Sequence, residues 1–216
     1  MFAVLKTLFA KYQTSYGKIV LVSLAMLGAI EATATPLSAS RQLLEHPNYV
    51  AAVGPILTPL GYTRFCFAYG DQCKVSNPIF RPKRMAATEA MVKDLDIVNR
   101  SVNRAIRPQA DAPGLLNDIW TIAPRAGDCD DYAVTKRAEL LKKGWSSRAL
   151  LLAKVVAPSG EDHLVLVART RLGDFVLDNL SQRVLPAAQT NLRWVGLQSA
   201  SNPHIWHRAA VRTTGV

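Results

Sequence analysis

The spacing of apolar residues along the chain predicts two helices. Over residues 88–106 these residues recur every three or four positions, the pattern of an amphipathic helix. A second helix is predicted over residues 129–143, because Gly127 permits a sharp turn, Asp128 can cap the first turn, and acidic residues follow. Cys129 is therefore expected at the N-terminus of a helix.

The second half of the chain changes to the pattern of strands. Runs rich in Val and Leu predict three of them, over residues 149–156, 163–170 and 175–180. Only four residues separate the last two runs, which predicts a tight turn and an antiparallel hairpin. Helices and an antiparallel sheet in one chain indicate an α+β protein.

The register of this hairpin places two polar side chains near each other. If the turn centres on Arg171 and Leu172, Val165 pairs with Asp178. His163 then lies diagonally from Asp178 on the same face, roughly 7 to 8 Å away between backbones. An imidazole and a carboxylate are thus expected within reach of each other.

The first 34 residues have the pattern of a secretion signal. Three lysines precede a twelve-residue apolar block over residues 19–30, and small residues follow it. Cleavage is expected after Ala34, with residues 37–39 as a second site. The block is short for a bilayer span, so an uncleaved anchor is the weaker alternative and no stable membrane span is expected after cleavage.

Composition argues against a disordered protein, and the distribution of charge argues against a nucleic-acid-binding protein. The chain has 216 residues, of which 49% are hydrophobic and 19% charged, which excludes a mainly disordered protein. Loss of the signal leaves 23 basic and 15 acidic residues, a net charge of +8. The basic residues are scattered and no nucleic-acid motif is present, so we expect a solvated basic surface and no nucleic-acid partner.

The three cysteines divide into a neighbouring pair and a single residue. Cys66 and Cys73 flank a turn-prone stretch, and an oxidising compartment would allow them to form a disulfide; two buried free thiols are the alternative. Such a bridge would pin residues 35–82, which are rich in Pro, Gly and aromatic residues and are predicted to form an irregular N-terminal arm. Cys129 is left over, the first indication of chemistry.

Cys129, His163 and Asp178 together have the chemistry of a nucleophile, its base and an orienting carboxylate. A helix N-terminus lowers the pKa of a thiol, although the aspartates beside Cys129 oppose this. Each residue also has an ordinary interpretation, as a packed cysteine, a surface histidine and the start of a turn. His46, His204 and His207 compete with His163 for the role of the base. Asn99 and Asn103 can be solvated polar residues of their helix or part of a site.

Longer motifs around these residues resemble a known family. They are Gly127-Asp128-Cys129-Asp130-Asp131-Tyr132 opening a helix, His163 beginning a strand, and Val176-Leu177-Asp178-Asn179. The chain resembles the bacterial transglutaminase-like cysteine proteinases in these motifs, and in the cysteine pair, residues 98–103, residues 118–124 and residues 194–206. Asp162, where many relatives have glycine, is a departure.

The resemblance implies a fold and a mechanism. The expected core is papain/transglutaminase-like, with the helix of the nucleophile packed on an antiparallel sheet, and the peptidase domain spans residues 83–216. Cys129 would attack a peptide carbonyl, His163 would transfer the proton, and Asp178 would orient the imidazole. The backbone amide of Cys129 is one oxyanion donor, with Trp120 and Asn117 as candidates for a second.

The resemblance also implies cofactors and partners. The best-understood relatives are periplasmic, calcium-dependent proteases that release a surface adhesin of biofilms under the control of an inner-membrane receptor for cyclic-di-GMP. The positions that match their calcium ligands are Asp128, Asp130 and Asp131, which helix capping explains equally well. A protein substrate, a receptor partner and no organic cofactor are expected.

Two other classes of function stay open from sequence. A transglutaminase-type acyl transferase or amidase would use the same thioester and pass it to an amine instead of water. A binding module of the same fold would keep the architecture without catalysis. The intact motifs favour the peptidase.

Overall fold

The computed structural model describes residues 49–74, 82–114 and 116–212, all within one unit of the chain, residues 36–216. The predicted secretion signal, its cleavage sites and His46 lie outside the described residues. Within the described part of the chain, no helix combines the length and the apolar character needed to cross a membrane.

A seven-stranded sheet forms the centre of the fold, in the order β1-β9-β8-β4-β5-β6-β7, and all its neighbouring strands are antiparallel. Its strands are β1 (Tyr49–Ile56), β4 (Leu150–Val156), β5 (Asp162–Thr170), β6 (Gly173–Leu177), β7 (Leu185–Pro186), β8 (Arg193–Gln198) and β9 (Trp206–Arg212). Two short strands, β2 (Arg107–Pro108) and β3 (Ala126–Gly127), form a separate parallel pair. The three strands expected from the Val and Leu runs are β4, β5 and β6, but β6 ends at Leu177, so residues 178–180 form a turn and not the end of the strand.

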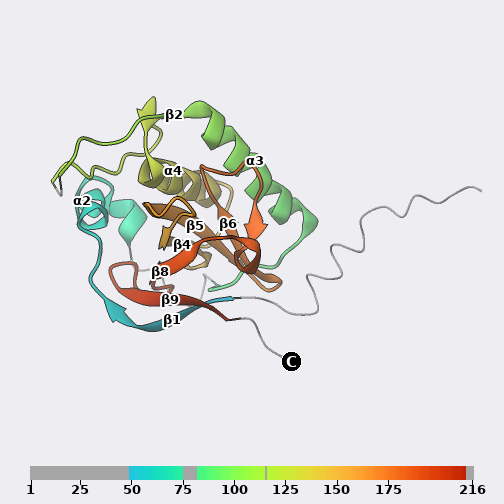
Figure 1. Ribbon diagram of the computed structural model, residues 1–216. Coiled ribbons are helices and arrows are strands. Elements are labelled where there is room, and N and C mark those ends of the chain that lie inside the picture. The colour runs from blue at the N-terminus through green and yellow to red at the C-terminus, as the bar shows by residue number, and fades with distance from the viewer. Residues whose placement is uncertain (1–48, 75–81, 115, 213–216) are drawn as a thin grey trace, which may run out of the picture. The chain divides into compact units, whose positions relative to one another are not determined.

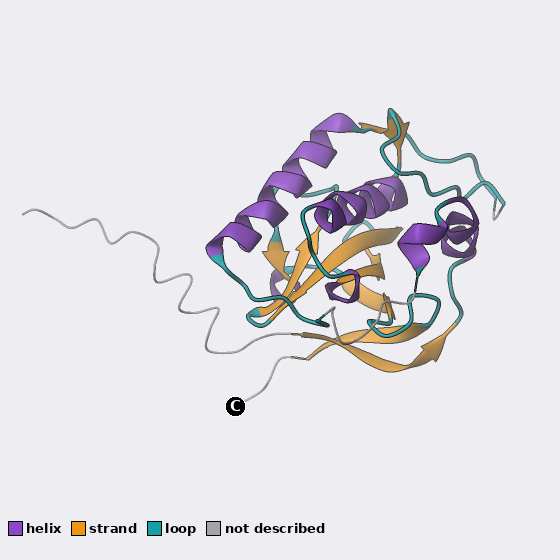
Figure 2. Ribbon diagram, turned by 180° about the vertical axis from the view of Figure 1, so that it is seen from behind, coloured by secondary structure: helices purple, strands orange, loops and turns teal. Residues whose placement is uncertain are grey.

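Helices cover one side of this sheet. They are α2 (Leu60–Ala68), α3 (Glu89–Ala105) and α4 (Cys129–Lys142). The chain also forms the 3-10 turns η1 (Gly70–Cys73), η2 (Ser147–Ala149) and η3 (Ala187–Gln189), and Ala187 of η3 packs on the other side of the sheet. Figures 1 and 2 show α3 and α4 over the β4–β6 part of the sheet, with β1 and β9 along the opposite edge. Both predicted helices are confirmed, and so is the α+β class.

Alternating side chains of β4 and β5 enter two different cores. On the helix side, Leu152 and Leu166 pack with Leu95 of α3 and Leu140 of α4. On the other side, Val155, Val165 and Val167 pack with Val50 of β1 and Leu197 of β8. A sheet buried on both faces explains why its strands read as continuous apolar runs instead of alternating ones.

The helix α4 is buried on most of its surface. Ten of its fourteen residues are buried, including the polar Asp130, Asp131, Lys136 and Arg137. It packs between α3 on one side and strand β5 of the sheet on the other, so little of its surface is exposed to solvent (Figure 1). The residue at its first position, Cys129, is half-buried and packs against the helix-side core.

The N-terminal segment, residues 35–82, differs from the irregular arm that the sequence predicts. Its described part contains the strand β1 and the helix α2. β1 pairs with β9, at the far end of the described chain, in the same sheet as the β5–β6 hairpin. A partner that far along the chain leaves no local signal, and the glycine and prolines in this stretch hide the strand.

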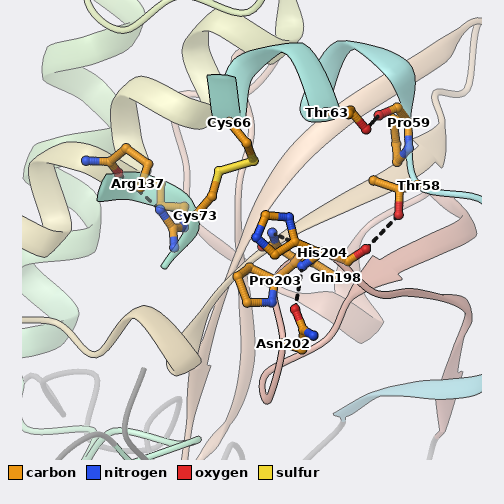
Figure 3. Close-up of a disulfide and its surroundings, with 11 residues drawn as sticks. Thr58, Pro59, Thr63, Cys66, Cys73, Arg137, Gln198, Asn202, Pro203 and His204 are labelled. Carbon is orange, nitrogen blue, oxygen red and sulfur yellow. Dashed lines mark hydrogen bonds between the residues drawn. A yellow bond between two sulfur atoms is a disulfide. The ribbon is translucent and has the colours of Figure 1, made fainter. Parts of the chain in front are cut away.

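A disulfide joins Cys66 of α2 to Cys73 of η1, as predicted (Figure 3). Next to it, the guanidinium of Arg137 reaches from α4 and donates to Gln72 Oε1 at 3.1 Å and to the carbonyl oxygen of Leu150 at 3.2 Å. The disulfide-closed turn is thereby attached to the helix that carries Cys129.

Candidate active site

Cys129 owes its position to the turn that precedes α4. Gly127 sits so close to Asp131 that an added Cβ would lie 1.9 Å from Asp131 Oδ2, so only glycine fits. The Asp131 carboxylate accepts hydrogen bonds from the backbone amides of Thr121, at 2.6 Å, and Asp128, at 3.2 Å. Asp131 therefore ties the start of α4 to the preceding loop.

His163 and Asp178 meet at the end of the β5–β6 hairpin. The pairs Thr170–Gly173 and Leu166–Leu177 confirm the predicted two-residue turn and its register. His163 Nε2 and Asp178 Oδ1 lie 2.8 Å apart, and the same oxygen accepts from the Leu180 amide at 2.9 Å. The bond to Nε2 leaves Nδ1 as the ring nitrogen free to serve a second partner.

The turn after β6, residues 178–181, is held from α3. Asn103 Nδ2 donates to the carbonyl oxygens of Asp178 and Ser181, each at 3.0 Å, and Asn99 Nδ2 donates to Ser181 at 2.8 Å. Asn99 is fully buried. The two asparagines are thus not solvated surface residues; they fix the backbone on which Asp178 sits.

Cys129 and His163 line the same cavity, of about 230 Å³. The other residues around it are Pro59, Asp118, Trp120, Asp130, Lys154, Asp162 and Leu164. The thiol also lies against β5, because the backbone amide of Leu164, the residue after His163, hydrogen-bonds its sulfur. The structure therefore brings the predicted nucleophile and base to one cleft, while His204 packs beside Tyr62 and His207 belongs to β9.

Burial dominates the electrostatics of the thiol. It raises the pKa of Cys129 to about 12, the Leu164 amide lowers it, and the charges of Asp130 and Asp128 raise it again. The lowering expected at a helix N-terminus is outweighed, so the resting group is a thiol. Its proton must pass to a base before it can act as a nucleophile.

Asp178 stays ionised in spite of its surroundings. Burial alone would raise its pKa, but the hydrogen bond and charge of His163, the Leu180 amide and the charge of Lys136 bring it below the ordinary value. A carboxylate bonded to an imidazole fixes the ring and stabilises its protonated form.

Negative charge is concentrated beside Cys129. Ligand atoms of Asp128, Cys129 and Asp130 lie within 4.8 Å of one another, and one oxygen of each aspartate is buried without a hydrogen-bond partner. Burial first, then the neighbouring Asp128, raises the pKa of Asp130 to about 10. Asp118 adds to this field.

The two side chains considered as second oxyanion donors are both engaged elsewhere. Trp120 Nε1 donates to Asp118 Oδ1 at 2.6 Å, and Asn117 Nδ2 donates to the carbonyl oxygen of Pro113 at 2.8 Å. The indole has a single donor, so Trp120 contributes to the cleft through its apolar surface.

Sequence reasoning assigned no site role to several residues of this region. Lys154 and Asp162, the latter noted only as a departure from the family, line the cavity with 3.6 Å between Nζ and Oδ2, and Asp118 adds charge to the acidic cluster. Lys136 is fully buried near Asp178. A lysine in a charged stretch is usually exposed, so only the three-dimensional packing identifies it.

Solved structures of similar fold come from Legionella pneumophila LapG. The calcium-bound form has a TM-score of 0.46 at 22% identity, covering 56% of this chain and 71% of LapG. A second LapG structure has a TM-score of 0.45 at 23% identity, covering 54% and 68%. The EGTA-treated form has a TM-score of 0.45 at 22% identity, covering 57% and 72%.

No curated protein matches the chain. The sequence profile of the bacterial transglutaminase-like cysteine proteinases, BTLCP, matches residues 52–213. This range begins inside β1, so the described N-terminal segment belongs to the family domain, together with residues 83–212. The chain belongs to the bacterial transglutaminase-like cysteine proteinase family.

Proposed function

We propose that the protein is an exported cysteine peptidase that hydrolyses a peptide bond of a protein substrate through Cys129, His163 and Asp178. The observation that carries this is the 2.8 Å contact between His163 Nε2 and Asp178 Oδ1 at the cavity that Cys129 also lines. Membership of a cysteine proteinase family supports the reaction class.

The proposed reaction assigns one role to each of these groups. His163 Nδ1 takes the thiol proton as Cys129 Sγ attacks the carbonyl carbon, and Asp178 stabilises the imidazolium that forms. The protonated imidazole then gives its proton to the leaving amine, which departs as the thioester forms. Water, deprotonated by the same imidazole, releases the acid and restores the thiol. The backbone amide of Cys129, at the first turn of α4, is the proposed oxyanion donor.

Digestion of a peptide library derived from a bacterial proteome tests this function. New N-termini identified by mass spectrometry are expected with the wild-type protein and not with Cys129→Ala. The Lys142→Met variant, altered at an exposed position of the same helix, is expected to match the wild type. Cleavage that survives Cys129→Ala would overturn the proposal.

The transferase alternative needs its own readout. A fluorescent primary amine such as dansylcadaverine, supplied with casein, would be incorporated by a transglutaminase-type enzyme. We expect hydrolysis without incorporation. Incorporation that depends on Cys129 and exceeds cleavage would favour the transferase, and absence of both activities would leave the binding module.

We propose that the acidic cluster of Asp128 and Asp130 binds a calcium ion. Asp128 and Asp130 fit a hard cation, because each has a buried carboxylate oxygen without a hydrogen-bond partner, and Asp118 adds negative charge. Both oxygens of Asp131 already accept backbone amides, so its main part is to hold α4 in place. When bound, calcium would neutralise the carboxylates that raise the pKa of Cys129.

Calorimetric titration with calcium chloride tests this site directly. We expect binding by the wild type, binding lost in Asp130→Asn, and binding retained in Asp96→Asn, which removes an exposed carboxylate of α3. Equal binding by the two variants would contradict the assignment.

A periplasmic location and a surface-adhesin substrate are proposed from the family resemblance, with control by an inner-membrane receptor. The Cys66–Cys73 disulfide supports an oxidising compartment. Fractionation of cells should place the mature protein in the periplasmic extract, and recovery in the cytoplasm alone would refute the location.

A further inference from the structure

Lys136 carries a charge into the interior without a direct partner. It lies two helical turns after Cys129 on α4, and its side chain is fully buried. Among the described residues its Nζ has no hydrogen-bond partner, and the nearest aromatic ring, that of Tyr132, has its centroid 5.8 Å away. Ammonium groups are almost never buried without a compensating charge, so the position calls for an explanation.

Asp178 supplies the compensating charge. Burial lowers the pKa of Lys136 to about 7, and the charge of Asp178 opposes that shift. The turn that carries Asp178 is also rich in acceptors, because the side-chain oxygens of Asn99, Asn103 and Asn179 are buried without a donor. The buried ammonium group and the Asp178 carboxylate thus interact electrostatically, without a direct hydrogen bond between them.

The charged groups that act on Asp178 are His163 and Lys136, and Arg183, a few residues later, lines the same cavity as Asp178. β5 supplies His163 and α4 supplies Lys136, whereas α3 supplies the neutral Asn99 and Asn103. In the resting site the imidazole must be neutral in order to accept the thiol proton. Lys136 is then the positive charge that favours ionised Asp178 before the reaction starts.

We propose that Lys136 is a positioning residue of the active site, whose buried ammonium group adds to the interactions that keep Asp178 ionised for its bond to His163. The inference rests on the proposed triad and deepens it, since Lys136 touches neither substrate nor thiol and acts only through Asp178. A purely structural lysine would pack through its aliphatic stem, and its charge would be dispensable.

The Lys136→Met variant removes the charge and keeps the length of the stem. The first readout is the titration of the Asp178 carboxyl carbon by NMR, which does not require catalysis. Its midpoint is expected to rise by about one pH unit in Lys136→Met, and to stay unchanged in Lys142→Met, an exposed lysine of the same helix. An unchanged midpoint in both variants would overturn the proposal.

The second readout is the rate of Cys129 alkylation by iodoacetamide from pH 4 to 6. Because the Asp178 pKa lies below its ordinary value, we expect the rate of Lys136→Met to fall about two- to threefold relative to wild type at the acid end of this range and to approach the wild-type rate at pH 6, with most of the loss recovered in Lys136→Arg. In the Asp178→Asn background the Lys136→Met change should have no further effect. The same loss in that background would assign Lys136 a structural role and refute the inference.

These results separate the inference from the proposed function. If wild-type alkylation does not depend on His163, the triad itself fails, whatever Lys136 does to the Asp178 midpoint. If alkylation depends on His163 and Asp178 but not on Lys136, only the inference fails. Lys136→Arg also covers the case in which Lys136→Met does not fold.

Discussion

Replacement of Gly127 by alanine should damage both the stability and the reactivity of the protein. The new Cβ would lie 1.9 Å from Asp131 Oδ2 and 2.6 Å from Asp131 Cγ. The carboxylate cannot withdraw freely, because it accepts the amides of Thr121 and Asp128. Hydrogen bonds to a charged group contribute about 1.5–3 kcal/mol each, so loss of one, with partial loss of the other, should lower the free energy of unfolding by about 2–4 kcal/mol.

Urea unfolding of Gly127→Ala, followed by tryptophan fluorescence, measures this loss. Gly70→Ala is the matched control, because a Cβ at Gly70 meets no heavy atom within 4 Å, and we expect a change within about 0.5 kcal/mol. Alkylation of Cys129 should also slow in Gly127→Ala, since the nucleophile lies two residues away. Equal stability of the two variants would refute this explanation of the glycine.

Three further predictions concern the disulfide, the Asp178 turn and Lys136. In the Cys66→Ser/Cys73→Ser variant the free energy of unfolding in urea should fall by about 2.5 kcal/mol, the loop-closure value for so short a loop. Wild type in reducing agent should lose the same amount, and unequal losses would contradict the loop-closure explanation. Asn103→Leu removes the bonds to Asp178 and Ser181, so unfolding free energy should fall by about 1–3 kcal/mol and alkylation should slow, whereas Asn191→Leu on an exposed loop should leave alkylation unchanged. For Lys136 the pKa falls from 10.5 to about 7 on folding, so the unfolded chain binds the extra proton between these values and wild-type stability rises with pH there. Lys136→Met should therefore be more stable by about 5 kcal/mol below pH 7, with the difference shrinking toward pH 10.5, and a pH-independent difference in urea unfolding would contradict the burial of a charge.

Local pattern was sufficient for the elements that carry the candidate site. The apolar spacing of α3 and the capped start of α4 are signals within single helices, and a two-residue turn fixes the register of the β5–β6 hairpin. That register placed His163 beside Asp178. The family resemblance, and not a local pattern, predicted that the helix of Cys129 packs on the sheet that carries His163, because no local pattern indicates which helix packs on which strand.

The features that sequence reasoning missed depend on distant packing. β1 is a strand because β9 pairs with it, and Lys136 is fully buried although it stands in a charged stretch of the sequence. The effect of burial on Cys129 likewise exceeds the helix effect that the sequence suggests. Such results follow from solvent exclusion, which single-sequence patterns do not encode.

The rate of iodoacetamide alkylation of Cys129 against pH tests the proposed triad most directly, since the other two cysteines form a disulfide. The wild type, His163→Ala and Asp178→Ala would be compared, each with calcium and with chelator. Because the resting group is a thiol, we predict that His163, acting as base, makes alkylation of the wild type below pH 8 much faster than alkylation of His163→Ala, with a smaller loss in Asp178→Ala and faster reaction with calcium. Slow alkylation with one common pH profile in all three proteins would contradict a catalytic Cys129–His163 pair.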